Sequence, residues 1–188
     1  MTKTKQKAAI FLDRDGVIIE NQANYVLSWD DVEIFEQAME TLARYSDQNY
    51  LFIIVTNQSP VGRGLISFDH AMSINARLIE IIESRGGRID GAYICPHAPQ
   101  ENCNCRKPKP GMLLKAAKEF DIDLSRSVMI GDALTDLKAG IEAGVSKTIL
   151  LKTGRGVDQM SLMQKGEFEN SEIYKDLSYA FSRIFGEA

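Results

Sequence analysis

The sequence predicts a doubly wound α/β domain, in which helices cover both faces of a parallel sheet. Five short runs are rich in Ile, Val, Leu and Phe without polar alternation, as expected for strands that are buried on both faces. These runs are residues 8–12, 51–55, 92–94, 128–130 and 148–151. Helical patterns lie between them, and this alternation implies right-handed crossovers between parallel strands. The length of 188 residues suits one domain, which we expect to span residues 1–188.

Four segments carry apolar residues at helical spacing, and each predicts a helix face that packs on the sheet. The faces are Phe35, Met39 and Leu42; Ile74, Leu78 and Ile81; Leu113, Ala117 and Phe120; and Leu134, Leu137 and Ile141. Pro110 suits a helix start, and Gly144 suits the position just past a helix end. The chain is polar after Gly154, and we expect a short strand and a final helix over residues 173–185.

Polar residues follow directly after four of the predicted strands. They are Asp13, Thr56 with Asn57, Cys95, and Gly131 with Asp132. Open α/β sheets bind their ligands outside the carboxyl ends of the strands. We therefore expect these four strand ends to meet at one rim of the sheet and to form a site there.

Charge and composition limit the partners that the chain can bind. The net charge of −4 argues against nucleic acid, because a binder of the phosphate backbone needs a basic face. No run of about eighteen apolar residues exists that could span a membrane. The basic start, residues 1–7, is followed by only about five apolar residues, which are too few for a signal-peptide core. We expect a cytoplasmic monomer with no nucleic-acid or membrane partner.

Several polar residues near this rim have the types needed for phosphoryl transfer through a carboxylate. Such chemistry needs a carboxylate that forms an aspartyl-phosphate, a metal, a second acid for the leaving oxygen, and donors around the phosphoryl group. The candidates are Asp13 and Asp15 beside Gly16, the Thr56 hydroxyl, the Lys107 ammonium, and Asp132 with Asp136 one helical turn later. Each alone also fits a helix cap, a turn or a solvated charge, but their joint order favours catalysis. The residue types do not rank Asp13 above Asp15 as the attacking group.

A cluster of metal-ligand residues lies in a loop at about residues 95–105. It contains all three cysteines and one of the two histidines: Cys95, His97, Cys103 and Cys105. Three thiolates and an imidazole complete a tetrahedral Zn²⁺ shell with no open position, so we expect a structural zinc site. The alternative is a set of reduced cysteines without a metal, since an odd count disfavours a disulfide framework. The loop continues into Arg106 and Lys107, which zinc would place beside the phosphate.

The order of these motifs over residues 8–151 resembles the haloacid dehalogenase (HAD) superfamily of phosphotransferases. The resemblance implies a Rossmann-like HAD fold and a Mg²⁺-dependent phosphatase. It makes Asp13 the nucleophile and Asp15 the general acid and then base, while Thr56 and Lys107 hold the phosphoryl oxygens. The implied Mg²⁺ ligands are Asp13, the Asp15 backbone carbonyl and Asp132, with Asp136 in support.

Other motifs resemble one branch of this superfamily, the D,D-heptose 1,7-bisphosphate phosphatases of the histidinol-phosphatase-like subfamily III. They are Phe-Leu-Asp-Arg-Asp-Gly, Val-Thr-Asn-Gln-Ser-x-x-x-Arg-Gly, Cys-Pro-His and Cys-x-Cys-Arg-Lys-Pro. The branch carries a zinc loop and no large cap domain, and its substrate is a phosphorylated sugar. The substrate-binding residues implied by the resemblance are Asn24, Tyr25, Asn57, Gln58, Ser59 and Arg106. The sequence departs from the branch at Ala133, where members often carry Lys, and over residues 20–29.

Other functions remain to be compared with this one. A histidinol-phosphate phosphatase or a broad sugar-phosphate phosphatase would share the catalytic motifs and differ in substrate. A zinc-stapled binding module would explain the cysteines but not the four acids. A non-catalytic scaffold would be expected to lack one catalytic acid, and none is missing.

Overall fold

The computed structural model describes residues 6–164, 166–168 and 170–186, so the first five residues of the basic start lie outside it. Its centre is a parallel sheet with the strand order β3-β2-β1-β4-β5-β6. The strands are β1 (Ala8–Leu12), β2 (Tyr50–Asn57), β3 (Gly91–Cys95), β4 (Val128–Gly131), β5 (Lys147–Leu151) and β6 (Ser171–Tyr174). The order reverses beside β1, which pairs with both β2 and β4. The predicted parallel α/β architecture is confirmed.

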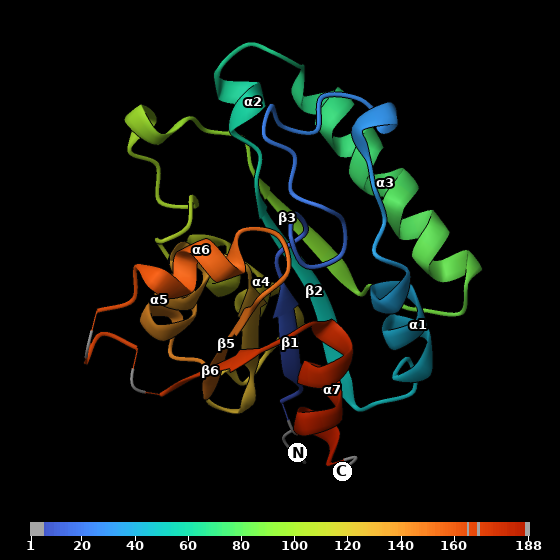
Figure 1. The fold of residues 1–188 in the computed structure, drawn as a ribbon, viewed down its shortest axis with the longest axis vertical. Coiled ribbons are helices and arrows are strands. Elements are labelled where there is room, and N and C mark those ends of the chain that lie inside the picture. The colour runs from blue at the N-terminus through green and yellow to red at the C-terminus, as the bar shows by residue number, and fades with distance from the viewer. Residues whose placement is uncertain (1–5, 165, 169, 187–188) are drawn as a thin grey trace.

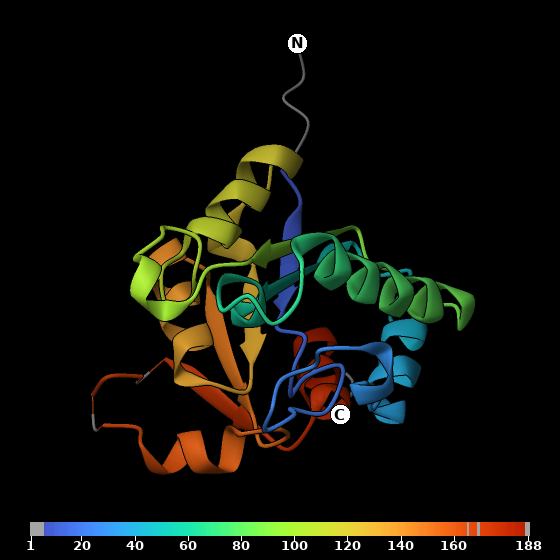
Figure 2. The ribbon, with the colours of Figure 1, turned by 90° about the horizontal axis from the view of Figure 1, so that it is seen from above.

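Helices cover both faces of this sheet (Figures 1 and 2). One face packs against α1 (Glu36–Arg44), α3 (Phe68–Ser84) and α7 (Leu177–Phe185), and the other against α4 (Gly111–Phe120) and α5 (Leu134–Ala143). Successive side chains of β1 alternate between the two cores: Ile10 and Leu12 enter the first, and Ala9 and Phe11 the second. Because both faces are covered, the strands show the continuous apolar runs seen in the sequence.

Two details of the predicted elements are wrong. Ile141 is 49% exposed, because α5 packs through smaller residues that include Ala139 and Gly140. A short helix, α6 (Gly156–Ser161), follows β5 where no helix was predicted, and its Val157 is exposed. The predicted final strand and helix correspond to β6 and α7.

The remaining elements are short. They are α2 (Ser59–Gly62) and the 3-10 turns η1 (Trp29–Asp31), η2 (Pro99–Glu101) and η3 (Leu124–Arg126). Residues 13–35, between β1 and α1, contain η1 alone, so no large cap domain is inserted there. No helix in the described ranges is long and apolar enough to cross a membrane.

Candidate active site

The carboxyl ends of the central strands bring two catalytic candidates together. Leu12 pairs with Ile130 across the β1–β4 ladder, so that Asp13 and Asp132 follow adjacent strands. The Asp13 N–H donates to the Ile130 carbonyl at 2.9 Å, which extends the ladder by one bond. Both aspartates are buried, Asp132 completely. The topology therefore explains why these carboxylates, far apart in sequence, lie side by side.

Lys107 is a buried cation between two carboxylates. Its Nζ lies 2.9 Å from Asp13 Oδ1 and 2.7 Å from Asp136 Oδ1. It also donates to the Val55 carbonyl at 2.7 Å. Burial acts to lower the pKa of Lys107, but the two carboxylates outweigh it and raise that pKa. Lys107 is therefore charged at neutral pH and fixed at the centre of the cluster.

Burial also governs the acids. It raises the pKa of Asp13 to about 7, with Lys107 acting in the opposite direction and the other aspartates reinforcing the rise. Burial raises the pKa of Asp132 as well, against the opposing effect of the Arg155 guanidinium. These carboxylates are costly to ionise in this protein unless a cation joins them.

Asp15 lies two residues after Asp13, and its carboxylate accepts hydrogen bonds from four donor atoms. Arg14 donates to it through Nε at 3.1 Å and Nη2 at 2.9 Å. Gln58 Nε2 and Thr56 Oγ1 donate to Asp15 Oδ2 at 3.1 and 3.3 Å. Arg14 is buried and also donates to Asn75 Oδ1 on α3 at 2.7 Å. Asp15 therefore has a different environment from Asp13, which suits a separate role.

The aspartates Asp13, Asp132 and Asp136 could hold a metal ion, since one oxygen of each lies within 4.8 Å of the others. Carboxylate oxygens are the ligands that Mg²⁺ prefers. Burial raises the pKa values of both Asp13 and Asp132, and a cation bound between them would favour their ionised forms. The donor set and its charge both fit Mg²⁺.

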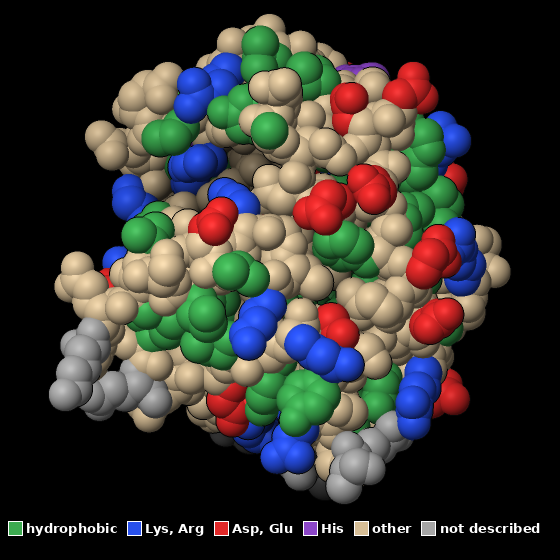
Figure 3. All heavy atoms as spheres, viewed as in Figure 1, with side chains coloured by type: hydrophobic (Ala, Val, Ile, Leu, Met, Phe, Trp, Pro, Cys, Tyr) green, Lys and Arg blue, Asp and Glu red, His purple; other side chains and the backbone are tan. Residues whose placement is uncertain are grey.

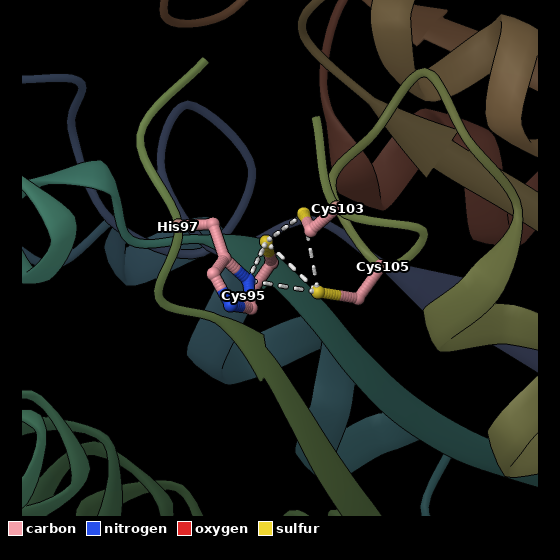
Figure 4. A group of neighbouring side chains, drawn as sticks. All are labelled: Cys95, His97, Cys103 and Cys105. Carbon is pink, nitrogen blue, oxygen red and sulfur yellow. Dashed lines mark hydrogen bonds between the residues drawn. The ribbon is translucent and has the colours of Figure 1, made fainter. Parts of the chain in front are cut away.

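The four metal-ligand residues of the loop after β3 converge on one point (Figure 4). The Sγ atoms lie 3.1–3.5 Å apart, and His97 Nδ1 lies 3.6 Å from Cys95 Sγ and 3.3 Å from Cys105 Sγ. Ligand atoms on a tetrahedral zinc ion lie roughly 3.5–3.8 Å apart, given bonds of about 2.3 Å to sulfur and 2.0 Å to nitrogen. All three cysteines are free, so the cluster fits a closed four-ligand metal site.

The loop that carries this cluster is joined to the acids through Lys107. The Asn57 side chain accepts from the Lys107 N–H and donates to the Lys107 carbonyl, both at 3.1 Å. Arg106 Nη1 donates to the His97 carbonyl at 3.2 Å. Both ends of the Asn57 amide are therefore used to hold Lys107, although sequence reasoning assigned Asn57 to the substrate.

A pocket of about 540 Å³ opens above the acids. Lys and Arg side chains flank the hollow between the α2 end of the molecule and α6 (Figure 3). The wall includes predicted site residues, namely Asp13, Asp15, Tyr25, Thr56, Asn57, Gln58, Ser59, Arg106, Lys107 and Asp136. Asn24 is exposed and absent from this wall. Sequence reasoning missed Asn21 and Arg155, which also line it.

The outer part of the pocket is formed by the loop at residues 20–29. Asn21 Nδ2 donates to Asp132 Oδ2 at 3.2 Å. From Tyr25 onward the loop contacts the α2–α3 region instead, with the Arg63 guanidinium 5.9 Å from the Tyr25 ring centre. The Leu27 carbonyl lies 2.9 Å from His70 Nε2, and Arg77 stacks over Trp29 at 4.3 Å. The loop thus covers the acids while resting on a separate part of the fold.

Comparisons with known proteins agree with this geometry. A family model described as HAD-hyrolase-like matches residues 104–180. The D-glycero-beta-D-manno-heptose-1,7-bisphosphate 7-phosphatase of Pasteurella multocida (strain Pm70) is 39% identical over 81% of this chain and 86% of its own length. The enzyme of that name from Bordetella bronchiseptica is 33% identical over 95% of this chain and 98% of its own.

A solved structure shows the same fold. The crystal structure of D,D-heptose 1,7-bisphosphate phosphatase from B. bronchiseptica, complexed with magnesium and phosphate, superposes with a TM-score of 0.89 at 31% identity. The alignment covers 96% of this chain and 99% of that one. Fold and site together define a HAD-like phosphatase. The chain belongs to the family of D-glycero-beta-D-manno-heptose-1,7-bisphosphate 7-phosphatases.

Proposed function

We propose that this enzyme removes the 7-phosphate of D-glycero-beta-D-manno-heptose 1,7-bisphosphate through an aspartyl-phosphate on Asp13. The relatives' names support the substrate. The observation that carries the chemistry is the contact of Lys107 with Asp13 at 2.9 Å, inside a cluster of carboxylates whose oxygens lie within 4.8 Å of one another. This arrangement supports a reaction in which Asp13 is the nucleophile, Lys107 the cation beside it and the carboxylate cluster the metal-binding group.

In this mechanism Asp13 attacks phosphorus, and the bond to the sugar oxygen breaks. Asp15 donates a proton to that leaving oxygen and then takes one from the water that hydrolyses the aspartyl-phosphate. Lys107 and the Thr56 hydroxyl donate to the phosphoryl oxygens, where negative charge is spread in the transition state. Their support comes from position, since Thr56 lies beside Asp15 and Lys107 beside Asp13.

We assign Mg²⁺ to Asp13, the Asp15 backbone carbonyl and Asp132, with Asp136 as a supporting carboxylate. A cation held there would neutralise negative charge on the phosphoryl oxygens and draw electrons from them. Asp136 suits support, because its Oδ2 accepts from the Ala133 N–H at 3.0 Å and its Oδ1 faces Lys107.

We assign structural Zn²⁺ to Cys95, His97, Cys103 and Cys105. Zinc would fix the start and the end of the loop that leads into Arg106. Arg106 lines the pocket, where its planar guanidinium suits the non-reacting phosphate of a bisphosphate. Among the other assigned substrate residues, Gln58 and Ser59 are buried in the pocket wall, and Tyr25 lies at its mouth.

The substrate is tested by measuring kcat/KM for heptose 1,7-bisphosphate beside histidinol phosphate, which shares the catalytic requirements but has one phosphate. We expect a preference for the bisphosphate on the order of a hundredfold, or about 2.7 kcal/mol of transition-state discrimination. Equal efficiencies would contradict the heptose assignment and would favour a broad phosphatase. A preference for histidinol phosphate would move the enzyme to that alternative.

Zinc removal should slow the enzyme strongly even at saturating Mg²⁺. Without the ion the loop loses its closed ligand shell, and Arg106 and Lys107 lose their fixed positions. We expect turnover to fall by roughly ten- to a hundredfold, the usual effect of losing support around a metal-dependent site. The measurement is turnover after treatment with a zinc-selective chelator, with zinc content followed in parallel, and added Zn²⁺ should restore activity. Full turnover in zinc-free protein would contradict the coupling.

A further inference from the structure

The loop after β5 packs tightly against Asp132, one of the carboxylates to which we assign the metal ion. Thr153 Oγ1 donates to the Gly16 carbonyl at 2.5 Å. A side chain at Gly154 would place its Cβ only 2.5 Å from Asp132 Oδ2 and from the Gly16 Cα. The loop therefore has a fixed place beside Asp132, and the next residue, Arg155, is delivered to the site by the backbone.

Arg155 occupies both oxygens of Asp132. Its backbone N–H and Nε donate to Oδ2 at 2.9 and 3.3 Å, and its Nη2 donates to Oδ1 at 3.1 Å. The Asp132 side chain is fully buried, whereas the Arg155 side chain is 51% exposed and lines the pocket. The guanidinium is thus the solvent-facing member of the pair and can leave without unpacking the core.

A divalent cation would compete with this guanidinium. Arg155 Nη2 donates to Asp132 Oδ1, so a metal ion that binds this oxygen competes with the guanidinium for its lone pairs and repels its positive charge. The cluster holds four carboxylates, Asp13, Asp15, Asp132 and Asp136, against three cations, Arg14, Lys107 and Arg155. A divalent cation adds two positive charges and makes the net charge of this cluster positive. The electrostatic balance then no longer favours the guanidinium at Asp132, and it favours an anion in the pocket.

We propose that Arg155 is a substrate-binding residue that pairs with Asp132 in the metal-free enzyme and turns to the substrate when a divalent cation binds. Arg155 and Arg106 come from different loops and line the same pocket. A guanidinium binds phosphate in the bidentate manner in which it binds carboxylate, so the same group serves both partners. This inference rests on the proposed function, because it needs a substrate with a phosphate left after the reaction.

The first test is Mn²⁺ binding to the full-length Arg155→Ala variant, measured by electron paramagnetic resonance without substrate. Removal of a competing cation should tighten binding roughly tenfold if Asp132 is free in about one molecule in ten of the wild type. Lys152→Ala is the matched control, because it removes an exposed positive charge from the same loop. It should tighten binding less than twofold. Weaker or unchanged Mn²⁺ binding in Arg155→Ala would mean that Arg155 only supports Asp132, and would overturn the proposal.

The second test compares two substrates at saturating Mg²⁺. The KM for heptose 1,7-bisphosphate should rise in Arg155→Ala by about tenfold more than the KM for p-nitrophenyl phosphate, which lacks a second phosphate. Equal changes in KM for both substrates would exclude contact between Arg155 and the non-reacting phosphate. If the wild type fails to hydrolyse the bisphosphate but hydrolyses p-nitrophenyl phosphate, the substrate assignment fails. In that case Mn²⁺ binding still decides whether Arg155 competes for Asp132.

Discussion

The Asp13→Asn variant should lose at least about 10⁴-fold in kcat, the scale seen when a covalent nucleophile is removed. An amide does not attack phosphorus, while the rest of the cluster stays in place. The measurement is release of inorganic phosphate at saturating Mg²⁺. Asp15→Asn is the matched comparison, because the residue types alone do not decide which aspartate attacks. Trapped phosphoenzyme from Asp15→Asn and none from Asp13→Asn would assign the nucleophile, and turnover of Asp13→Asn at the wild-type rate would exclude this mechanism.

The stability of the same variant shows whether it is folded. Burial raises the pKa of Asp13 to about 7, so the folded state binds this proton more tightly than the unfolded state does. This contribution to stability is therefore present at low pH and is lost as the pH rises toward 7 and above. Without metal, Asp13→Asn should melt above the wild type at pH 8, and the difference should shrink toward pH 5. Mg²⁺ should raise the melting temperature of the wild type more than that of the variant.

The Lys107→Met variant should lose both activity and stability. Its ammonium contacts Asp13, Asp136 and the Val55 carbonyl, and the side chain is almost fully buried. Removing one partner of a buried ion pair costs about 3–5 kcal/mol, because the remaining charge is left without compensation. The loss of a donor to the phosphoryl group should also lower kcat on the order of 10³-fold. Urea denaturation and phosphate release measure the two effects.

Two further variants separate these effects of Lys107. Lys118→Met removes an exposed lysine from α4 and should change stability by less than about 0.5 kcal/mol. Adding Asp136→Asn to Lys107→Met removes one of the stranded carboxylates and should recover part of the stability without recovering activity. If Lys107→Met has the same free energy of unfolding as the wild type, the buried cation does not contribute to stability. The carboxylate cluster is then better solvated than its burial indicates.

The parts of the structure that follow from local pattern could be predicted from the sequence. Buried strands of Ile, Val and Leu place Asp13, Thr56 and Asp132 at strand ends, and parallel topology brings such ends together. The Cys and His spacing likewise predicted a convergent cluster. These predictions needed only the continuous apolar runs of buried strands and the chemistry of side chains.

The residues that sequence reasoning missed lie in loops whose paths depend on tertiary packing. Arg155 meets Asp132 because Gly154 allows the loop to approach Gly16 closely, and no periodicity signals that fold-back. Asn21 reaches the acids where Asn24 was predicted to lie near the substrate, since one turn of an irregular loop decides which amide points inward. α5 turns Ile141 outward because small residues allow closer packing on the sheet.

The loop at residues 20–29 is supported by a different part of the fold from the catalytic acids, which has a consequence for how such enzymes diverge. From Tyr25 to Trp29 the loop rests on Arg63, His70 and Arg77, whereas the acids rest on the ends of β1 and β4. Mutations in the loop and in its supports can therefore accumulate without disturbing the reaction centre. Selection for a new phosphate ester would act on this outer segment first, and a duplicated gene could change its substrate while keeping the ancestral chemistry.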